Sequence, residues 1–171
     1  MQVSDTNLVG VKVIVPDLFE DARGAYLELF DTETYRDLCG ELNFVQDDIS
    51  FSNKDVLRGV HGDFATTKLV SILNGTGYAL LADNRPESAS YRQWQAFRIS
   101  RENRKQLLIP PGIGNSVVAL TDNLIYHYKQ TTHFEYGNQF TIRWDDESWG
   151  FEWPIEHPIL SARDMHGCYS H

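Results

Sequence analysis

Short runs of β-branched and aromatic residues recur along the chain from Leu8 to Trp144. Clusters of Gly, Pro, Asn, Asp and Ser separate them, such as NGTG, DNRPES and PPGIGN, and these are residues of tight turns. Many short strands joined by short turns are typical of a β sandwich or barrel, so we expect an all-β fold. The expected strands are LVGVKVIV, YLELF, NFVQDDISFS, KLVSIL, GYALLAD, WQAFRIS, QLLIP, SVVAL, NLIYHYKQT and QFTIRW.

One segment, DTETYRDLC, departs from the strand pattern and predicts a helix. Asp31 or Thr32 can cap its first turn, and Leu38 falls on the same face as Tyr35. No tandem repeat and no Gly/Ser-rich or Pro-rich linker divides the chain. We therefore expect one domain over residues 1–171, with a polar tail after about residue 164.

Composition narrows the possible partners. The 171 residues are 42% hydrophobic and 23% charged, which is typical of a globular domain. A net charge of −9 repels phosphate backbones, so a nucleic-acid partner is not expected. No apolar run is long enough to cross a bilayer, and the first ten residues lack the features of a signal peptide, which indicates no membrane partner and a cytoplasmic location. Cys39 and Cys168 form no CxxC motif and are interpreted as structural thiols.

A barrel of this size can enclose a small molecule, so inward-facing polar side chains are the first candidates for chemistry. In NLIYHYKQT, Tyr126 and Tyr128 share one face of the strand, and His127 and Lys129 share the other. We expect the tyrosines to point inward, because a tyrosine buries a large apolar ring together with its hydroxyl.

Titratable residues also interrupt the strand-like segments VLRGVHGDFATTKLV and ILSARD. His61 and Lys68 are seven positions apart, and the intervening GDFATT predicts a turn, so the two strands of a hairpin could direct both side chains into one cavity. Gly59 permits a bulge or a close backbone approach that could bring Arg58 toward His61.

Each of these residues has a simpler structural interpretation. His61 alone is more often a hydrogen-bonded structural residue, and Lys68 an edge charge that discourages aggregation. Tyr128 alone is a core aromatic with a bonded hydroxyl, and Asp164 a turn or salt-bridge residue.

Taken together, the motifs resemble the nucleotide-sugar 3,5-epimerases, the dTDP-4-dehydrorhamnose 3,5-epimerase family. The similarity runs from about Gly10 to Asp164. It implies a cupin-like jelly-roll barrel with one or two short helices. The segments that carry it are DARGAYLELF, FVQDDISFS, VLRGVHG, KLV, LADNRPES, SRENRKQLLIPPG, YKQTT, RWDD and WPIEHPILSARD.

The resemblance implies a role for each matching position. His61 falls on the general base, Asp164 on its supporting carboxylate, Tyr128 on the opposing acid and Lys68 on the active-site lysine. The expected substrate is a nucleotide-diphosphate sugar, and the expected assembly is a homodimer in which Arg23 reaches the partner's site. The implied substrate-binding residues are Arg23, Glu28, Gln46, Asp48, Arg58 and Asn115.

These residue types suit the chemistry that the resemblance implies. A 4-keto group acidifies the protons at C3 and C5, so a base can remove one and an acid can return it from the opposite face. Histidine is a suitable base near neutral pH, a phenol is a suitable acid, and an ammonium stabilises the enolate oxygen between them. This chemistry requires no redox cofactor. Inversion at C3, at C5 or at both is open.

The sequence departs from the family pattern beside the proposed base. Gly62 and Asp63 follow His61 where the family usually has Tyr and Gln, Asn115 replaces a common histidine, and Asp48 replaces an asparagine. Relatives with Gly-Asp resemble enzymes of GDP-linked 4-keto heptoses as well as of dTDP sugars. The nucleotide and the sugar therefore stay open.

We expect no metal site. Metal-binding cupins use an HxH pair with a further histidine downstream, and here the matching positions hold Asp63 and Asn115. His127, His133 and His157 lack ligand spacing and are interpreted as surface residues. The terminal MHGCYSH, with His166, Cys168 and His171, is interpreted as a frayed tail.

Two other functions fit the same residues. A 3,4-ketoisomerase would move the carbonyl without inverting a centre. A sugar-nucleotide binding module would hold the ligand without turnover.

Overall fold

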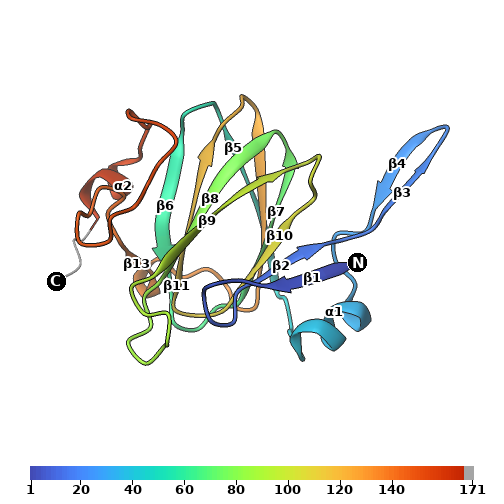
Figure 1. Cartoon of the computed structure of the whole chain (residues 1–171), viewed down its shortest axis with the longest axis horizontal. Coiled ribbons are helices and arrows are strands. Elements are labelled where there is room, and N and C mark those ends of the chain that lie inside the picture. Colours follow the sequence, from blue (N-terminus) through green and yellow to red (C-terminus); the bar gives the residue numbers. More distant parts are fainter. Residues whose placement is uncertain (168–171) are drawn as a thin grey trace.

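The computed structural model describes residues 1–167, which form two antiparallel sheets packed face to face (Figure 1). The first sheet has six strands, in the order β1 (Gln2–Asp5), β2 (Lys12–Val15), β10 (Gln106–Ile109), β7 (Lys68–Asn74), β12 (Leu124–Gln130) and β5 (Gln46–Ser52). The second has five, in the order β13 (Phe140–Thr141), β6 (Leu57–Gly62), β11 (Ile113–Ala119), β8 (Thr76–Asp83) and β9 (Trp94–Ser100).

Within the described chain, one hairpin, two short helices and one 3₁₀ turn lie outside these sheets. The hairpin of β3 (Leu18–Asp21) and β4 (Gly24–Leu27) projects away from the barrel at the end opposite α2 (Ala162–His166) (Figure 1). α1 (Thr32–Cys39) follows the hairpin, and a single 3₁₀ turn, η1 (Tyr136–Asn138), precedes β13. The prediction of an all-β barrel with short helices is confirmed.

Most predicted strands are present, with two differences near the N-terminus. β1 and β3 were not predicted, because QVSD and LFED are short and largely polar. The expected strand YLELF ends at Leu27, so residues 28–30 lead into α1 without pairing.

The main core lies between the two sheets and follows the period-2 alternation of the strands. Its centre consists of aliphatic side chains that are almost completely excluded from solvent, including Val70, Leu81, Ile99, Leu107 and Leu124. Tyr126 belongs to this core and Tyr128 packs against it, as predicted from the alternation in β12. The core fills one part of the interior and leaves the other part polar.

α1 covers part of the outer face of the six-stranded sheet. Asp31 caps it by accepting a hydrogen bond from the Thr34 amide at 2.8 Å, as the sequence predicts. Tyr35 is buried beneath the helix and donates its hydroxyl to Gln106 Oε1 at 2.6 Å. The side chains at 38 and 39 and residues 168–171 lie outside the described part, so the predictions for Leu38, Cys39, Cys168 and His171 stay predictions.

Within residues 1–167, neither helix has the length and hydrophobicity that a bilayer crossing requires.

Gly59 interrupts the regular pairing of β6 with β11, where the register shifts between Asn115 and Val117. Its φ of +126° lies in a region that side chains rarely adopt, and a Cβ here would overlap the Ser116 side chain. The register shift and the close approach to Ser116 agree with the prediction of a bulge or a close backbone approach at Gly59. Arg58 and His61 are three positions apart and would face opposite sides of a regular strand, yet both line the same cavity.

We predict that Gly59→Ala lowers the free energy of unfolding by about 2 kcal/mol or more, because it combines a disfavoured φ with a steric overlap. Chemical denaturation monitored by tryptophan fluorescence measures this change. Gly137→Ala is the control, since no atom lies within 4 Å of a Cβ at that position. Equal stability of the two variants would contradict a requirement for glycine at residue 59.

Candidate active site

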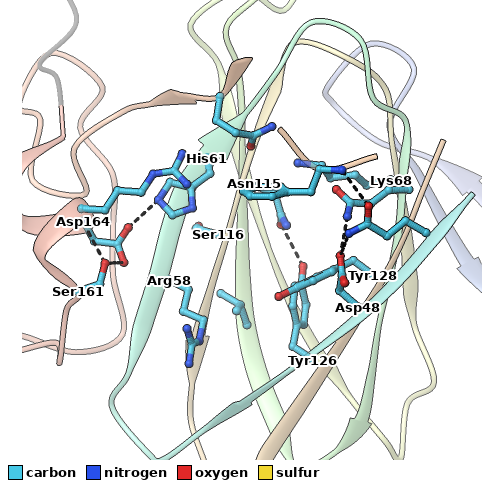
Figure 2. Close-up of a pocket in the computed structure, with 16 residues that line it drawn as sticks. Asp48, Arg58, His61, Lys68, Asn115, Ser116, Tyr126, Tyr128, Ser161 and Asp164 are labelled. Carbon is cyan, nitrogen blue, oxygen red and sulfur yellow. Dashed lines mark hydrogen bonds and ion pairs between the residues drawn. The ribbon is translucent and has the colours of Figure 1, made fainter. Parts of the chain in front are cut away.

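A cavity of about 480 Å³ opens between the polar ends of the two sheets (Figure 2). It is lined by Gln46, Asp48, Arg58, His61, Lys68, Asn115, Ser116, Val117, Tyr126, Tyr128, Gln130, Phe134, Gln139, Ser161, Arg163 and Asp164. Strands of both sheets, the segment around β13 and α2 all contribute side chains, so the site requires the complete barrel.

The six-stranded sheet supplies one wall as two rows of inward side chains. Lys68 on β7 is opposite Gln130 on β12, and Gln130 is opposite Gln46 on β5. The next inward row places Tyr128 opposite Asp48. Side chains two positions apart share a face, so Lys68 and Tyr128 lie diagonally on the same wall.

The amides of this wall hold Asp48 in place. Gln46 Nε2 and Gln130 Nε2 donate to Asp48 Oδ2 at 2.7 and 2.8 Å. Gln46 Oε1 in turn accepts from the Phe134 amide at 2.8 Å. Asp48 is therefore a fixed hydrogen-bond acceptor directly beside Tyr128.

The five-stranded sheet supplies the opposite wall, with His61 on β6 directly opposite Asn115 on β11. Figure 2 shows His61 and Asp164 on one side of the cavity and Tyr128, Asp48 and Lys68 on the other. Arg58 also reaches the cavity, with Nε donating to Ser52 Oγ at 3.0 Å and a terminal nitrogen to the Phe51 carbonyl at 3.1 Å.

His61 is hydrogen-bonded to a buried carboxylate. Its Nε2 lies 2.6 Å from Asp164 Oδ1, and only 3% of the Asp164 side chain is exposed. Ser161, the N-cap of α2, donates its hydroxyl to Asp164 Oδ2 at 2.8 Å. A parallel bridge between Val56 and Ile159 ties the segment before α2 to the start of β6, which brings Asp164 to His61.

This hydrogen bond determines which nitrogen of His61 can act as a base. Burial favours the protonated form of Asp164, but hydrogen bonds from His61 and Ser161 outweigh it and lower the pKa of this carboxyl below its ordinary value. An ionised carboxylate only accepts, so Nε2 carries the proton and donates it. Nδ1 is then the free acceptor in the neutral ring.

Two tyrosines in edge-to-face contact line the lower part of the cavity, with ring centroids 5.4 Å apart. Tyr126 donates its hydroxyl to Asn115 Oδ1 at 3.0 Å, and burial raises its pKa, so this hydroxyl stays protonated. Asn115 is the residue that replaces a common family histidine, and here it links the two sheets. Tyr128 keeps its hydroxyl within the cavity (Figure 2).

Lys68 is the most buried cation of the site. Burial lowers the pKa of its ammonium, and the neighbouring Asp63 carboxylate partly reverses this effect. Arg163, which approaches from α2, disfavours the charged form of Lys68. Lys68, Arg58 and Arg163 therefore give the cavity three basic side chains, although the chain as a whole carries a net charge of −9.

The structure corrects one part of the predicted geometry. β6 and β7 do not form a hairpin, because β6 pairs with β11 and β13 while β7 pairs with β10 and β12. Residues 63–67 cross from one sheet to the other. The inner face of each sheet is the face that lies against the other sheet. His61 in one sheet and Lys68 in the other therefore both point inward.

Arg23 and Glu28 do not line this cavity. Arg23 lies near the tip of the β3–β4 hairpin with 90% of its side chain exposed, and it is paired with Asp21. Glu28 is also exposed, just after β4. Because Arg23 is expected to reach the site of a partner subunit, its role stays a prediction. Gln46, Asp48, Arg58 and Asn115 all line the cavity as expected.

Sequence reasoning missed several lining residues, namely Tyr126 as a site residue, Gln130, Phe134, Gln139, Ser161 and Arg163. Alternation in β12 could have identified Gln130, which shares the inward face of Tyr128. Phe134 and Gln139 lie in irregular chain between β12 and β13, where no periodicity indicates direction.

The histidine interpretations are partly tested. His127 lies on the outer face of β12, with Nε2 2.9 Å from Asp47 Oδ1, beside the Lys129–Asp47 ion pair. No group of three or more His, Cys, Asp or Glu within residues 1–167 is arranged to hold a metal ion.

The fold and the cavity define a class of protein: a small antiparallel barrel with a polar interior site, where an imidazole–carboxylate pair faces a phenol and an ammonium. A model of the dTDP-4-dehydrorhamnose 3,5-epimerase family matches residues 5–169. The chain belongs to this family, as the sequence motifs predicted.

Individual relatives cover nearly the whole chain. The dTDP-4-dehydrorhamnose 3,5-epimerase of Salmonella typhimurium is 37% identical over 169 residues, which are 96% of this chain and 92% of the relative. The crystal structure of the Bacillus anthracis enzyme with TDP and PPi bound superposes with a TM-score of 0.95 at 30% identity, covering 99% of both chains. The Legionella pneumophila epimerase in complex with dTDP-4-keto-L-rhamnose gives a TM-score of 0.90 at 32% identity, covering 95% of this chain and 89% of that one.

We predict that Asp164→Asn lowers the free energy of unfolding by about 1–3 kcal/mol at pH 5, because it removes a buried charged acceptor. The folded-state pKa of Asp164 lies below its unfolded value, so its stabilisation is complete above about pH 4 and is lost as the pH falls through the folded pKa. Urea denaturation from pH 5 to pH 2 should show the two proteins converging. A constant difference across this range would contradict an ionised Asp164.

Proposed function

We propose that this protein is an epimerase that inverts C3, C5 or both of a nucleotide-linked 4-keto sugar. The observation that supports the proposal most strongly is that the candidate base and the candidate acid come from opposite sheets. His61 extends from β6 and Tyr128 from β12, with the cavity between them. Inversion requires a proton to leave one face of a carbon and another to arrive at the opposite face, and this arrangement supplies a group for each.

The proton steps follow from the hydrogen bonds. Nδ1 of His61 takes the proton from the carbon beside the ketone. The C–H electron pair forms a C=C bond to the carbonyl carbon, and the π pair of the carbonyl moves to its oxygen, which gives an enolate. Asp164 stabilises the resulting imidazolium. The hydroxyl of Tyr128 then gives its proton to the opposite face of that carbon, which restores the ketone. His61 and Tyr128 return to their starting states by proton exchange with solvent.

Lys68 stabilises the intermediate in this proposal. Its buried ammonium lies on the same wall as Tyr128, and a fixed cation near the enolate oxygen lowers the barrier because no solvent has to reorganise. A single such donor contributes about 3–4 kcal/mol in well-studied enzymes. The route moves protons only, so it requires no redox cofactor.

Arg58 is proposed to bind the diphosphate, because its guanidinium is fixed at the cavity by Ser52 and the Phe51 carbonyl. The relatives support dTDP as the nucleotide, and the Legionella pneumophila complex holds a dTDP-linked keto sugar. Because Gly62 and Asp63 follow His61, a GDP-linked sugar is the alternative substrate. A cytoplasmic location also stays a prediction.

We further propose a homodimer in which the β3–β4 hairpin reaches the partner's site. The hairpin projects away from its own barrel (Figure 1). It carries the exposed aromatic side chains Phe19 and Tyr26. Ile49 and Phe51 on the edge strand β5 are exposed as well. Exposed apolar side chains on a projecting hairpin and on a sheet edge are suited to a partner subunit.

We predict that incubation with a dTDP-linked 4-keto sugar in heavy water places deuterium at C3, C5 or both, as product NMR and mass spectrometry measure. His61→Asn and Tyr128→Phe should each lower turnover by about 10²-fold or more while leaving substrate affinity within a few-fold of wild type. Retention of hydrogen at both carbons, with dTDP- and GDP-linked substrates alike, would contradict the proposal. A product with a relocated carbonyl would instead identify a ketoisomerase.

Mixing two inactive variants tests the role of Arg23. Arg23→Ala and His61→Asn subunits, dissociated and reassembled together, should recover about a quarter of wild-type activity, because half of the dimers are mixed and each mixed dimer has one intact site. No recovery from dimers shown by mass spectrometry to be mixed would place Arg23 outside the partner's site.

A further inference from the structure

Asp63 is a buried carboxylate next to the cavity whose role the proposed mechanism does not include. It follows directly after β6, where Gly62 packs against β13 and β11 so closely that a Cβ would overlap Phe140. Its carbonyl accepts from the Gly112 amide at 2.7 Å. The backbone is therefore fixed on both sides of the position that starts the crossing between the sheets.

The Asp63 carboxylate is fixed as firmly as its backbone. Oδ1 accepts from the amides of Ala65 and Thr66 at 2.9 and 2.6 Å, which closes the first turn of the crossing. Oδ2 accepts from Gln139 Nε2 at 2.7 Å. These hydrogen bonds outweigh the effect of burial and lower the pKa of Asp63, so the group is an anion at neutral pH.

The same Oδ2 lies 3.7 Å from the ammonium nitrogen of Lys68. The two side chains are 4% and 12% exposed, so water screens this ion pair only weakly. The separation is longer than a hydrogen bond. At this separation Asp63 makes no close hydrogen bond to Lys68, so the N–H groups of Lys68 stay available to a ligand in the cavity.

Asp63 is the only carboxylate in the described chain within ion-pair distance of Lys68. Of the other charged groups at the cavity, Asp48 is bonded to the amides of Gln46 and Gln130, and Asp164 to His61 and Ser161. Arg58 and Arg163 are cations, and Arg163 opposes the charge of Lys68. Without Asp63, the Lys68 ammonium would be buried near a second cation, Arg163, with no carboxylate among residues 1–167 close enough to balance its charge.

We propose that Asp63 is the positioning residue for Lys68, holding its ammonium charged and directed into the cavity without occupying its hydrogen-bond donors. This inference rests on the role assigned to Lys68 under the proposed function. A carboxylate in direct hydrogen bond would take up a donor, whereas an anion at 3.7 Å supplies the charge and leaves the donors to the enolate oxygen. Asp63 itself acts only through Lys68.

The direct test is the titration of Lys68 by NMR with ¹³Cε-labelled lysine, in the full chain and without substrate. The chain has five lysines, and Lys68→Arg assigns the signal by removing it. In Asp63→Asn the titration midpoint of Lys68 should fall by about one pH unit or more relative to wild type. Asp63→Ser, which keeps a short oxygen acceptor for the turn, should give the same shift.

Asp83→Asn is the matched control. Asp83 is also buried and ion-paired, but its partner is Arg85, at 2.7 Å, and not Lys68. This variant loses the same charge and should leave the Lys68 midpoint within about 0.3 units of wild type. A Lys68 midpoint unchanged in both Asp63 variants, or shifted equally in Asp83→Asn, would overturn the inference.

A second measurement separates this inference from the proposed function. If the wild-type protein is an epimerase, the alkaline limb of its rate profile should move to lower pH in Asp63→Asn, because the ammonium is lost earlier. An alkaline limb that stays in place despite a shifted Lys68 midpoint would overturn the catalytic part of the inference. If no 4-keto sugar is turned over, the proposed function fails, and the NMR titration still decides whether Asp63 keeps Lys68 charged.

Discussion

The hydrogen bond between the imidazole of His61 and the carboxylate of Asp164 connects the wall of the barrel to the last described helix. It is 2.6 Å long, the carboxylate is almost completely buried, and it joins the C-terminal segment directly to the cavity wall. A buried carboxylate is costly unless it is fully hydrogen-bonded, and here His61 and Ser161 supply that requirement. The same bond fixes the tautomer of the ring. The attachment of the C-terminal segment and the proposed proton transfer by His61 therefore both depend on this one hydrogen bond.

The two-sheet architecture explains how so small a domain can place groups on both sides of a sugar ring. Strand alternation sends every second side chain into the interior, and each sheet supplies its own set. The sheet with β6 supplies His61 and Asn115, and the sheet with β7 and β12 supplies Lys68 and Tyr128. The cavity is also locally basic within an acidic chain, which suits an anionic diphosphate.

Local sequence predicted what depends on short-range physics. Alternation in β12 correctly placed Tyr126 and Tyr128 inside, the Asp31 cap marked the start of α1, and Gly59 marked the irregular pairing of β6 with β11. The sequence could not show that β6 and β7 belong to different sheets. That outcome depends on pairing with β11 and β10, which lie some 40 residues away or more along the chain.

Other features depended on contacts that leave no local pattern. Arg163 and Ser161 reach the cavity because Ile159 bridges to Val56 far upstream, and Gln139 reaches Asp63 through irregular chain. The proposed placement of Arg23 beside a partner's site depends on a second subunit. The proposed role of His61 came from the resemblance, since a lone histidine in a strand is more often structural.

The division of labour between the two walls is tested most directly by comparing proton exchange with inversion in Tyr128→Phe. In heavy water this variant should still exchange the proton beside the ketone through His61 while forming little inverted sugar, whereas His61→Asn should do neither. Loss of exchange in Tyr128→Phe together with normal exchange in His61→Asn would show that the base lies on the other wall and would contradict the account.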